Sequence, residues 1–316
     1  MNGPPFVIAH RGASGYLPEH TREAKVLAYG QGADYLEQDV VATADGRLVV
    51  LHDVCLDDVT DVARRFPERR RQDGRFYVID FTLEELKALR VVERRRPGSD
   101  ARVFPGRFAD DDVEFRITTF DEELRLVRAL NATTGRSVGV YPEIKAPAFH
   151  WEHGVDLAAC VLETLERYGY SRREDAAVVQ CFDADELRRC RFELGTELKL
   201  AQLTEEGTAV VDLADVARYA DIWAPHYSAL LEPVRGHASD VEIRVSERAR
   251  EARRAGLELH PYTFRADAVP AQFADLAQQL EFFYAEVGVD AVFCDHPDIA
   301  VEVRARSAGR ASMLRR

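Results

Sequence analysis

Short apolar segments rich in β-branched residues recur along the chain, and stretches with apolar positions at helical spacing lie between them. This alternation is typical of βα units around a parallel sheet. Eight such units in a chain of 316 residues predict a (β/α)8 TIM barrel, with reactive groups at the carboxyl ends of the strands. The predicted strands are Phe6 to Ala9, Tyr35 to Val40, Val138 to Ile144, Ala177 to Cys181, Leu198 to Leu203, Asp221 to Pro225, Leu257 to Tyr262 and Ala291 to Cys294.

Capping residues mark the beginnings of several helices between these strands. Thr119 and Glu122 have the spacing of a capping box, and Asp183 and Glu186 have the same spacing further along the chain. Ser246 is a predicted N-cap of a charged helix that ends just before the next strand. These helices fit the gaps between the predicted strands.

One interval interrupts the alternation. From about residue 53 to residue 115 the chain has no barrel unit, although Thr82 is expected to cap a short helix. Structureless loops of this length are uncommon in compact domains, so we predict a small inserted subdomain within a barrel domain of residues 1–303. Its arginine-rich stretches, Arg64 to Arg75 and Arg94 to Arg102, are expected to be exposed to solvent. The basic stretch at residues 304–316 is predicted to be a disordered tail.

Composition and charge narrow the classes of function. The longest apolar stretches, such as Leu48 to Leu51, are far shorter than the roughly 20 residues that a bilayer span requires, so we expect no integral membrane segment. A net charge of −13 argues against nucleic acid as a partner, because binding to it depends largely on Lys and Arg. An anionic substrate must therefore meet a local cation, either a metal ion or an arginine in a cleft.

Two further features concern compartment and redox state. Five cysteines without a CxxC spacing fit neither a disulfide framework nor a zinc site and are expected to be buried, reduced thiols: Cys55, Cys160, Cys181, Cys190 and Cys294. The chain enters a predicted strand directly after Met1 to Pro5, which leaves no room for a signal peptide. The expected location is cytoplasmic, or periplasmic or secreted if a leader was removed. The pattern specifies no oligomeric state.

Two histidines are expected to meet at the mouth of the barrel. His10 and Arg11 directly follow the first strand, and the planar fork of an arginine suits the oxygens of a phosphate. His52 follows the strand-like run Arg47 to Leu51, and a turn at Ala44 to Gly46 would fold that run back toward the mouth. Two histidines beside a metal-bound phosphate can divide the duties of general base and general acid.

Three acidic residues predict a cation site. Glu37 and Asp39 stand two residues apart in the second strand, so their side chains share a face and repel each other unless a cation lies between them. Glu143 and Lys145 share a face at the end of the third strand. A third carboxylate makes the site rich in oxygen, as Ca²⁺ and Mg²⁺ prefer, and Lys145 is a predicted phosphate contact.

Other polar residues are weaker candidates. Four lie at or near strand ends: Gln180, Gln202, His226 and Tyr262. Of these, Gln180 and Tyr262 are predicted to contact the substrate. His20 is expected either to line the mouth or to cap a helix. His150 and His153 flank Trp151 and are expected to be solvated loop residues.

The sequence resembles the glycerophosphodiester phosphodiesterase family, and most closely its bacterial periplasmic branch. The resemblance begins with VIAHRGASGYLPEHT at Val7 and GADYLEQDVVATADGRLVVLHDVCLDDVTD at Gly32. It continues through YPEIKAP at Tyr141, QCFDADEL at Gln180, HPYT at His260 and DHPD at Asp295, so it covers nearly the whole chain. Together these motifs are highly specific.

The resemblance implies a (β/α)8 barrel with a small inserted domain and one divalent cation, Ca²⁺ or Mg²⁺. It implies hydrolysis of glycerophosphodiesters, such as glycerophosphocholine or glycerophosphoethanolamine, to sn-glycerol 3-phosphate and an alcohol. Many members have PENT where this chain has Pro18 to Thr21, with His20 third; the similar branch has the same histidine, so activity is expected to be retained. By resemblance the metal ligands are Glu37, Asp39 and Glu143, the catalytic pair is His10 and His52, and the phosphate contacts are Arg11 and Lys145.

Two other functions fit a barrel of this kind. The first is a phospholipase that cleaves an intact lipid headgroup, but the sequence has no long apolar loop or basic amphipathic helix for membrane docking. The second is a barrel that binds glycerophosphodiesters without catalysis. The complete set of two histidines and three carboxylates argues against the second, because a fold alone would not retain it.

Overall fold

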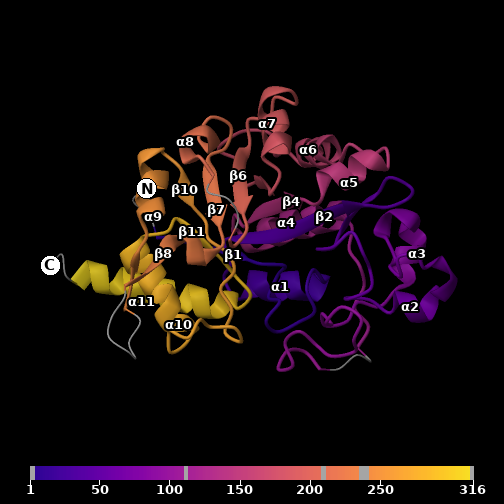
Figure 1. Ribbon diagram of the computed structural model, residues 1–316, viewed down its shortest axis with the longest axis horizontal. Coiled ribbons are helices and arrows are strands. Elements are labelled where there is room, and N and C mark those ends of the chain that lie inside the picture. Colours follow the sequence, from indigo (N-terminus) through magenta and orange to yellow (C-terminus); the bar gives the residue numbers. More distant parts are fainter. Residues whose placement is uncertain (1–3, 110–112, 208–210, 235–241, 314–316) are drawn as a thin grey trace.

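The computed structural model describes residues 4–109, 113–207, 211–234 and 242–313 and confirms the predicted TIM barrel. Eight parallel strands follow the order β10-β7-β6-β5-β4-β2-β1-β11 around the sheet. Figure 1 labels all of these strands except β5. The two ends of this order are joined where the Asp290 N–H donates to the Leu259 carbonyl at 3.0 Å and the Phe293 N–H to the Pro261 carbonyl at 3.1 Å. The strands are β1 (Phe6–Ala9), β2 (Tyr35–Ala42), β4 (Gly139–Ile144), β5 (Val178–Cys181), β6 (Lys199–Thr204), β7 (Ile222–Pro225), β10 (Glu258–Leu259) and β11 (Ala291–Cys294).

All eight predicted strands are present, and one is much shorter than predicted. The segment from Leu257 to Tyr262 is a regular strand only over β10, although the His260 N–H still donates to the Trp223 carbonyl at 3.1 Å and the Tyr262 N–H to the Pro225 carbonyl at 3.0 Å. Pro261 has no N–H to donate, and its carbonyl accepts the Phe293 N–H of β11, so the missing donor weakens the pairing on that edge. A two-stranded hairpin of β8 (Leu231–Val234) and β9 (Glu242–Val245) was not predicted.

Helices follow the strands and surround the sheet. They are α1 (Arg22–Gly30), α4 (Phe120–Thr134), α5 (Pro147–Glu152), α6 (Leu157–Arg167), α7 (Ala184–Phe192), α8 (Leu213–Val216), η3 (Tyr227–Leu230), α9 (Glu247–Arg254), α10 (Leu276–Phe282), η4 (Phe283–Val287) and α11 (Pro297–Met313). The capping box at Thr119 and the N-cap at Asp183 are confirmed. Ser246 precedes α9 as predicted, but its hydroxyl donates to the Ala229 carbonyl at 2.8 Å instead of capping the helix.

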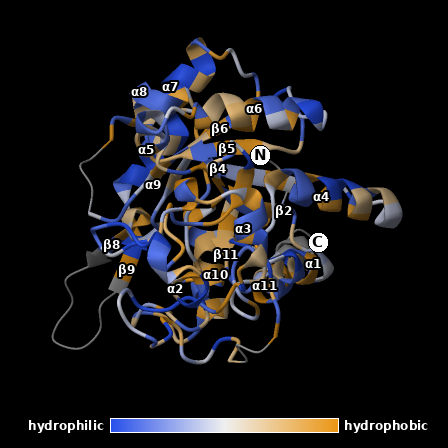
Figure 2. Cartoon of the chain, turned by 90° about the vertical axis from the view of Figure 1, so that its right-hand side faces the viewer, coloured by the Kyte–Doolittle hydropathy of each residue, from blue (hydrophilic) through white to orange (hydrophobic). Residues whose placement is uncertain are grey.

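Apolar residues fill both sides of the barrel wall. Nine buried residues fill the interior: Ile8, Tyr141, Val178, Ala201, Leu203, Ile222, Ala224, Ala291 and Phe293. A larger buried cluster packs the outer face of the strands against the helices. Figure 2 shows this layering, with hydrophobic colour on β11 and both hydrophilic and hydrophobic stretches on α6 and α7. None of the described helices is long and apolar enough to cross a membrane.

The interval between the second strand and α4 has an apolar cluster of its own. After the hairpin strand β3 (Leu48–Val50) come α2 (Val62–Arg65), η1 (Pro67–Arg69), η2 (Val78–Asp80) and α3 (Leu83–Ala88). In Figure 1, α2 and α3 lie at the right-hand end of the molecule. The buried residues of this cluster include Leu56, Phe76, Phe81, Leu86 and Phe115, and they pack on Val41 and Val49. We call residues 53–115 the insertion; that it is a separate subdomain stays a prediction.

The carboxyl-terminal stretch differs from the disordered tail that we expected at residues 304–316. Helix α11 continues to Met313, and residues 314–316 lie outside the described residues. Arg304 forms an ion pair with Asp34 and donates to the Pro5 carbonyl at 3.1 Å. These contacts attach the beginning of the basic stretch to the barrel.

Candidate active site

A cavity of about 130 Å³ opens at the carboxyl ends of the strands. Larger surface hollows, of about 470 Å³ beside α6 and about 640 Å³ in the insertion, have no histidine among the described residues that line them. The cavity at the mouth therefore carries the candidate chemistry. Its lining consists of His10, Arg11, Glu37, Asp39, His52, Glu143, Gln180, Phe182, Leu203, His226, Tyr262, Thr263, Arg265 and Phe293.

The structure brings the nine predicted site residues together. Eight of them line the cavity. The ninth, Lys145, lies beside it, with Nζ 2.8 Å from Glu143 Oε1 and 3.6 Å from Asp39 Oδ1. The β2–β3 hairpin returns His52 to the mouth as expected, because the Leu51 N–H donates to the Asp39 carbonyl at 2.9 Å. The roles of these residues stay predictions.

Three buried carboxylates meet on neighbouring strands. Glu37 and Asp39 are each 1% exposed, and Asp39 of β2 stands in register with Glu143 of β4. Burial and the charge of Asp39 raise the pKa of Glu37 well above its usual value, and burial raises that of Glu143 to about 8 against the pull of Lys145. Burial opposes ionisation of Asp39, but Lys145 and His52 hold its pKa well below the usual value. A bound cation would relieve the repulsion among these groups.

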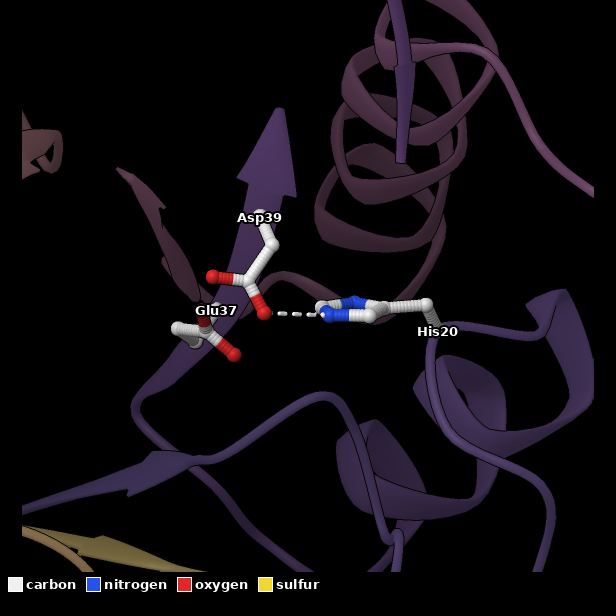
Figure 3. A group of neighbouring side chains, drawn as sticks. All are labelled: His20, Glu37 and Asp39. Carbon is white, nitrogen blue, oxygen red and sulfur yellow. Dashed lines mark hydrogen bonds and ion pairs between the residues drawn. The ribbon is translucent and has the colours of Figure 1, made fainter. Parts of the chain in front are cut away.

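The donor set fits a hard divalent cation. Potential ligand atoms of His20, Glu37 and Asp39 all lie within 4.8 Å of one another. Figure 3 shows the Asp39 carboxylate turned toward the His20 ring, whose Nε2 lies 2.7 Å from Asp39 Oδ2, with Glu37 beside it. Asp39 Oδ1 and Gln180 Oε1 are buried without a hydrogen-bond partner among the described residues. Oxygen atoms of this kind are the ligands that Ca²⁺ and Mg²⁺ prefer.

This arrangement differs in part from the predicted ligand set. His20 neither lines the cavity nor caps a helix; it is 2% exposed and contacts a carboxylate of the site. The position of His20 in the sequence does not predict its contact with Asp39. Glu143 is paired with Lys145, so its membership of the cation site stays a prediction.

Two histidines at the cavity, His10 and His52, are each held by an aspartate, whereas His226, which also lines it, has its Nδ1 2.7 Å from Ser228 Oγ. His10 Nδ1 lies 2.6 Å from Asp295 Oδ1, and His52 Nδ1 lies 2.7 Å from Asp53 Oδ1. An aspartate that accepts the Nδ1 proton leaves the Nε2 lone pair for the cavity. Burial, with Arg11 adding to it, lowers the pKa of His10 to about 4, and burial also lowers the pKa of His52. Without substrate both rings therefore favour the neutral form with Nε2 as an acceptor, and a phosphate anion bound in the cavity would favour protonation of the ring that acts as the acid.

Sequence reasoning did not identify these aspartates as site residues. Asp53 follows His52 directly, and Asp295 opens the DHPD motif at the end of β11. The sequence did carry a signal for them: one aspartate is next to a candidate catalytic histidine, and the other lies at the end of a barrel strand.

Arg94 corrects another expectation. Its side chain is 16% exposed, and its guanidinium pairs with Glu19 at 2.7 Å and with Asp53 at 2.7 Å, whereas the run from Arg94 to Arg102 was expected to be solvated. Carboxylates at the mouth draw this arginine inward.

Arg11 is surrounded by carboxylates. Its backbone N–H donates to Glu37 Oε2 at 2.6 Å, its Nη1 lies 3.0 Å from Glu19 Oε2, and its Nε lies 3.5 Å from Asp39 Oδ2. Tyr262 lines the cavity and donates its hydroxyl to the Thr204 carbonyl at 2.9 Å. That Arg11 contacts phosphate and Tyr262 contacts substrate stays a prediction.

Other polar candidates serve the fold. Gln202 Nε2 donates to the carbonyls of Phe182 and Leu203, each at 2.9 Å, so this residue satisfies buried backbone. His150 was expected to be solvated, but it is 1% exposed and accepts the Ala42 N–H at 3.1 Å. His153 is exposed, as expected.

Gly12 allows the chain to turn directly after Arg11, and this makes a testable prediction for stability. Its φ is +86°, and a Cβ there would lie 2.8 Å from the carbonyl carbon of Ala24. Gly74 has nearly the same φ, +87°, but an added methyl group there would meet no other described residue within 4 Å, so Gly74→Ala is the matched control. We expect Gly74→Ala to cost about 1 kcal/mol of unfolding free energy for its left-handed backbone. Gly12→Ala should cost about 1–3 kcal/mol more, because the added methyl meets backbone. Urea unfolding of both variants measures the difference, and equal losses would contradict the steric explanation.

Comparison with known proteins gives consistent results. Residues 10–299 match the model of the glycerophosphoryl diester phosphodiesterase family. The chain is 42% identical to a glycerophosphodiester phosphodiesterase of Haemophilus influenzae, with 96% of this chain and 90% of that protein covered. It is 37% identical to one of Treponema pallidum, with 96% and 92% covered.

Solved structures show the same fold. A crystal structure of a putative glycerophosphoryl diester phosphodiesterase from Silicibacter pomeroyi matches with a TM-score of 0.73 at 22% identity, covering 98% of this chain and 95% of that one. An Oleispira antarctica phosphodiesterase in complex with the product sn-glycerol-3-phosphate matches with a TM-score of 0.65 at 21% identity, covering 95% and 96%.

Proposed function

The chain belongs to the glycerophosphoryl diester phosphodiesterase family and is a hydrolase of glycerophosphodiesters, and we propose how its own residues perform the reaction. In this proposal His10 and His52 divide general base and general acid catalysis. Glu37, Asp39 and Glu143 would hold one divalent cation, Ca²⁺ or Mg²⁺.

The reaction needs one proton removed and one proton delivered. One histidine takes a proton at Nε2 from the nucleophile, which is water or the glycerol hydroxyl of the substrate itself. A new bond to phosphorus forms while the bond to the alcohol breaks, and the other histidine, which enters this step protonated at Nε2 as well as at Nδ1, gives its Nε2 proton to the departing oxygen and is left neutral. When bound, the cation withdraws charge from the phosphoryl oxygens. Arg11 and Lys145 bind the remaining anionic oxygens, and Gln180 and Tyr262 contact the substrate at the rim.

One observation carries this proposal above the others: two aspartate-held histidines and three buried carboxylates face one cavity. The net charge of −13 requires a local positive charge for an anionic substrate, and the carboxylates offer a site for a metal ion beside the arginines of the cavity. A binding protein without catalysis has no need of histidines whose tautomers are set by aspartates.

The test is a release assay with the untreated protein. We expect sn-glycerol 3-phosphate from glycerophosphocholine and glycerophosphoethanolamine, near-complete loss of that release with a chelator, and recovery when Ca²⁺ or Mg²⁺ is restored. The cation that restores the higher rate identifies the preferred metal. Release of a headgroup from an intact phospholipid in place of these products would favour the phospholipase. Binding of glycerophosphocholine without any product would favour the non-catalytic barrel, and full activity with chelator would contradict the cation's role.

A further inference from the structure

Two arginines of the insertion reach the aspartates that hold the active-site histidines. Arg94 Nη1 lies 2.7 Å from Asp53 Oδ2, and Arg107 Nη2 lies 2.7 Å from Asp295 Oδ2. In each aspartate the other oxygen faces histidine Nδ1, so each carboxylate lies between an arginine and an imidazole. The side chains of Arg94 and Arg107 are 16% and 6% exposed.

We propose that Arg94 and Arg107 are positioning residues through which the insertion orients both histidines of the reaction. The proposal rests on the catalytic roles proposed above for His10 and His52. Neither arginine lines the cavity, so each acts through its aspartate and does not contact the reacting atoms.

Arg94 connects two parts of the site. Its Nε and Nη2 lie 2.9 and 2.7 Å from the carboxylate of Glu19, and Glu19 in turn pairs with Arg11 Nη1 at 3.0 Å. A single guanidinium therefore fixes Asp53 behind His52 and Glu19 beside the predicted phosphate contact. The planar fork of arginine can bridge two carboxylates in this way, and the ammonium of a lysine cannot reproduce it.

Arg107 connects the insertion to the opposite side of the mouth. Besides Asp295 it contacts both carboxylate oxygens of Asp267, at 2.7 and 3.0 Å, and donates to the Ser14 carbonyl at 3.1 Å. Asp295 also pairs with Arg265 at 2.9 Å. Because that second cation remains after loss of Arg107, we expect substitution at Arg94 to have the larger effect.

The experiment compares Arg94→Ala with Arg71→Ala in the full chain. Arg71 also lies in the insertion and also pairs with an aspartate, Asp80, at 2.7 Å, but neither residue lines the cavity or pairs with an aspartate that holds a histidine. With glycerophosphocholine as substrate, we expect Arg94→Ala to lower kcat about 10- to 100-fold, the usual effect of removing a partner behind a site residue, with a smaller change in KM. Arg71→Ala should retain kcat, and thermal unfolding reports the stability of both variants.

A double-mutant cycle of Arg94→Ala with Asp53→Asn measures whether the two losses in kcat are coupled. A purely structural role of Arg94 would leave them independent. If Arg94 acts through Asp53, the double variant should lose much less than the product of the two single losses in kcat. Independent, multiplicative losses would overturn the proposal, as would a kcat for Arg94→Ala equal to that of Arg71→Ala. Should Arg94→Ala fail to fold, Arg94→Lys keeps a charge but not the bridge, and a normal kcat in it would also overturn the proposal.

His52→Ala in the same series separates this proposal from the proposed function. An active His52→Ala variant would overturn both. An inactive one together with a normal Arg94→Ala would overturn only the positioning role. An inactive one together with a slow, non-multiplicative Arg94→Ala is the result that we expect.

Discussion

Replacement of either His10 or His52 by alanine is expected to lower kcat for glycerophosphodiester hydrolysis by roughly 10²- to 10⁴-fold, the range that one positioned general acid or base contributes. Each ring presents Nε2 to the cavity, because its Nδ1 is held by an aspartate at 2.6 or 2.7 Å. Loss of one ring leaves one of the two proton transfers without a partner, while the cation site and Arg11 remain. Binding of substrate should therefore change less than kcat.

The fold should survive these substitutions. Without His10, Asp295 keeps its ion pairs with Arg107 and Arg265, and without His52, Asp53 keeps Arg94. His153→Ala is the control, since this histidine is exposed and does not line the cavity. Kinetics and thermal unfolding of the three variants give the comparison, and near-normal kcat in both cavity variants would remove the acid–base scheme.

The fold could be predicted because its signals are local. The strand at Phe6 to Ala9 is an apolar run in the sequence and has the same bounds in the structure. The capping box at Thr119 and Glu122 likewise depends on residues three apart. The contacts of Arg304 with Asp34 and with the Pro5 carbonyl, by contrast, join residues that are far apart in the chain. Local patterns carry no information on such contacts.

The site could be predicted only where strand geometry decides it. Glu37 and Asp39 share a face because strand side chains alternate. His52 returns to the mouth because β3 runs antiparallel to β2. The contacts of His20 with Asp39 and of Arg94 with Asp53 join segments by packing and by charge. In the sequence, His20 has the pattern of a loop residue and Arg94 that of a solvated arginine run. These contacts form only when the insertion packs against the mouth of the barrel, so the sequence pattern does not predict them.

The substitution Glu37→Gln is expected to separate cation binding from folding. It preserves the shape of the side chain and one oxygen acceptor. That oxygen can accept the Arg11 backbone N–H, which lies 2.6 Å from Glu37 Oε2 in the unaltered chain. It removes a charge that burial and Asp39 disfavour, as the raised pKa of Glu37 indicates. Without added cation, the free energy of unfolding should therefore stay the same or increase. Loss of the charge should weaken cation binding and lower activity at least about 100-fold, at the upper end of what a metal-site partner contributes.

Thermal unfolding with and without Ca²⁺ or Mg²⁺ measures the separation. A cation that binds only the folded protein stabilises it by about 2.7 kcal/mol at a concentration 100 times its Kd, so Tm of the unaltered chain should rise with added cation. The rise should be absent or much smaller in Glu37→Gln. Glu186→Gln is the control, because Glu186 is also buried, at 7% exposure, but pairs with Arg189 on α7 away from the cavity lining, and this variant should keep the full rise. An equal rise in Glu37→Gln and the unaltered chain would show that the cation binds elsewhere.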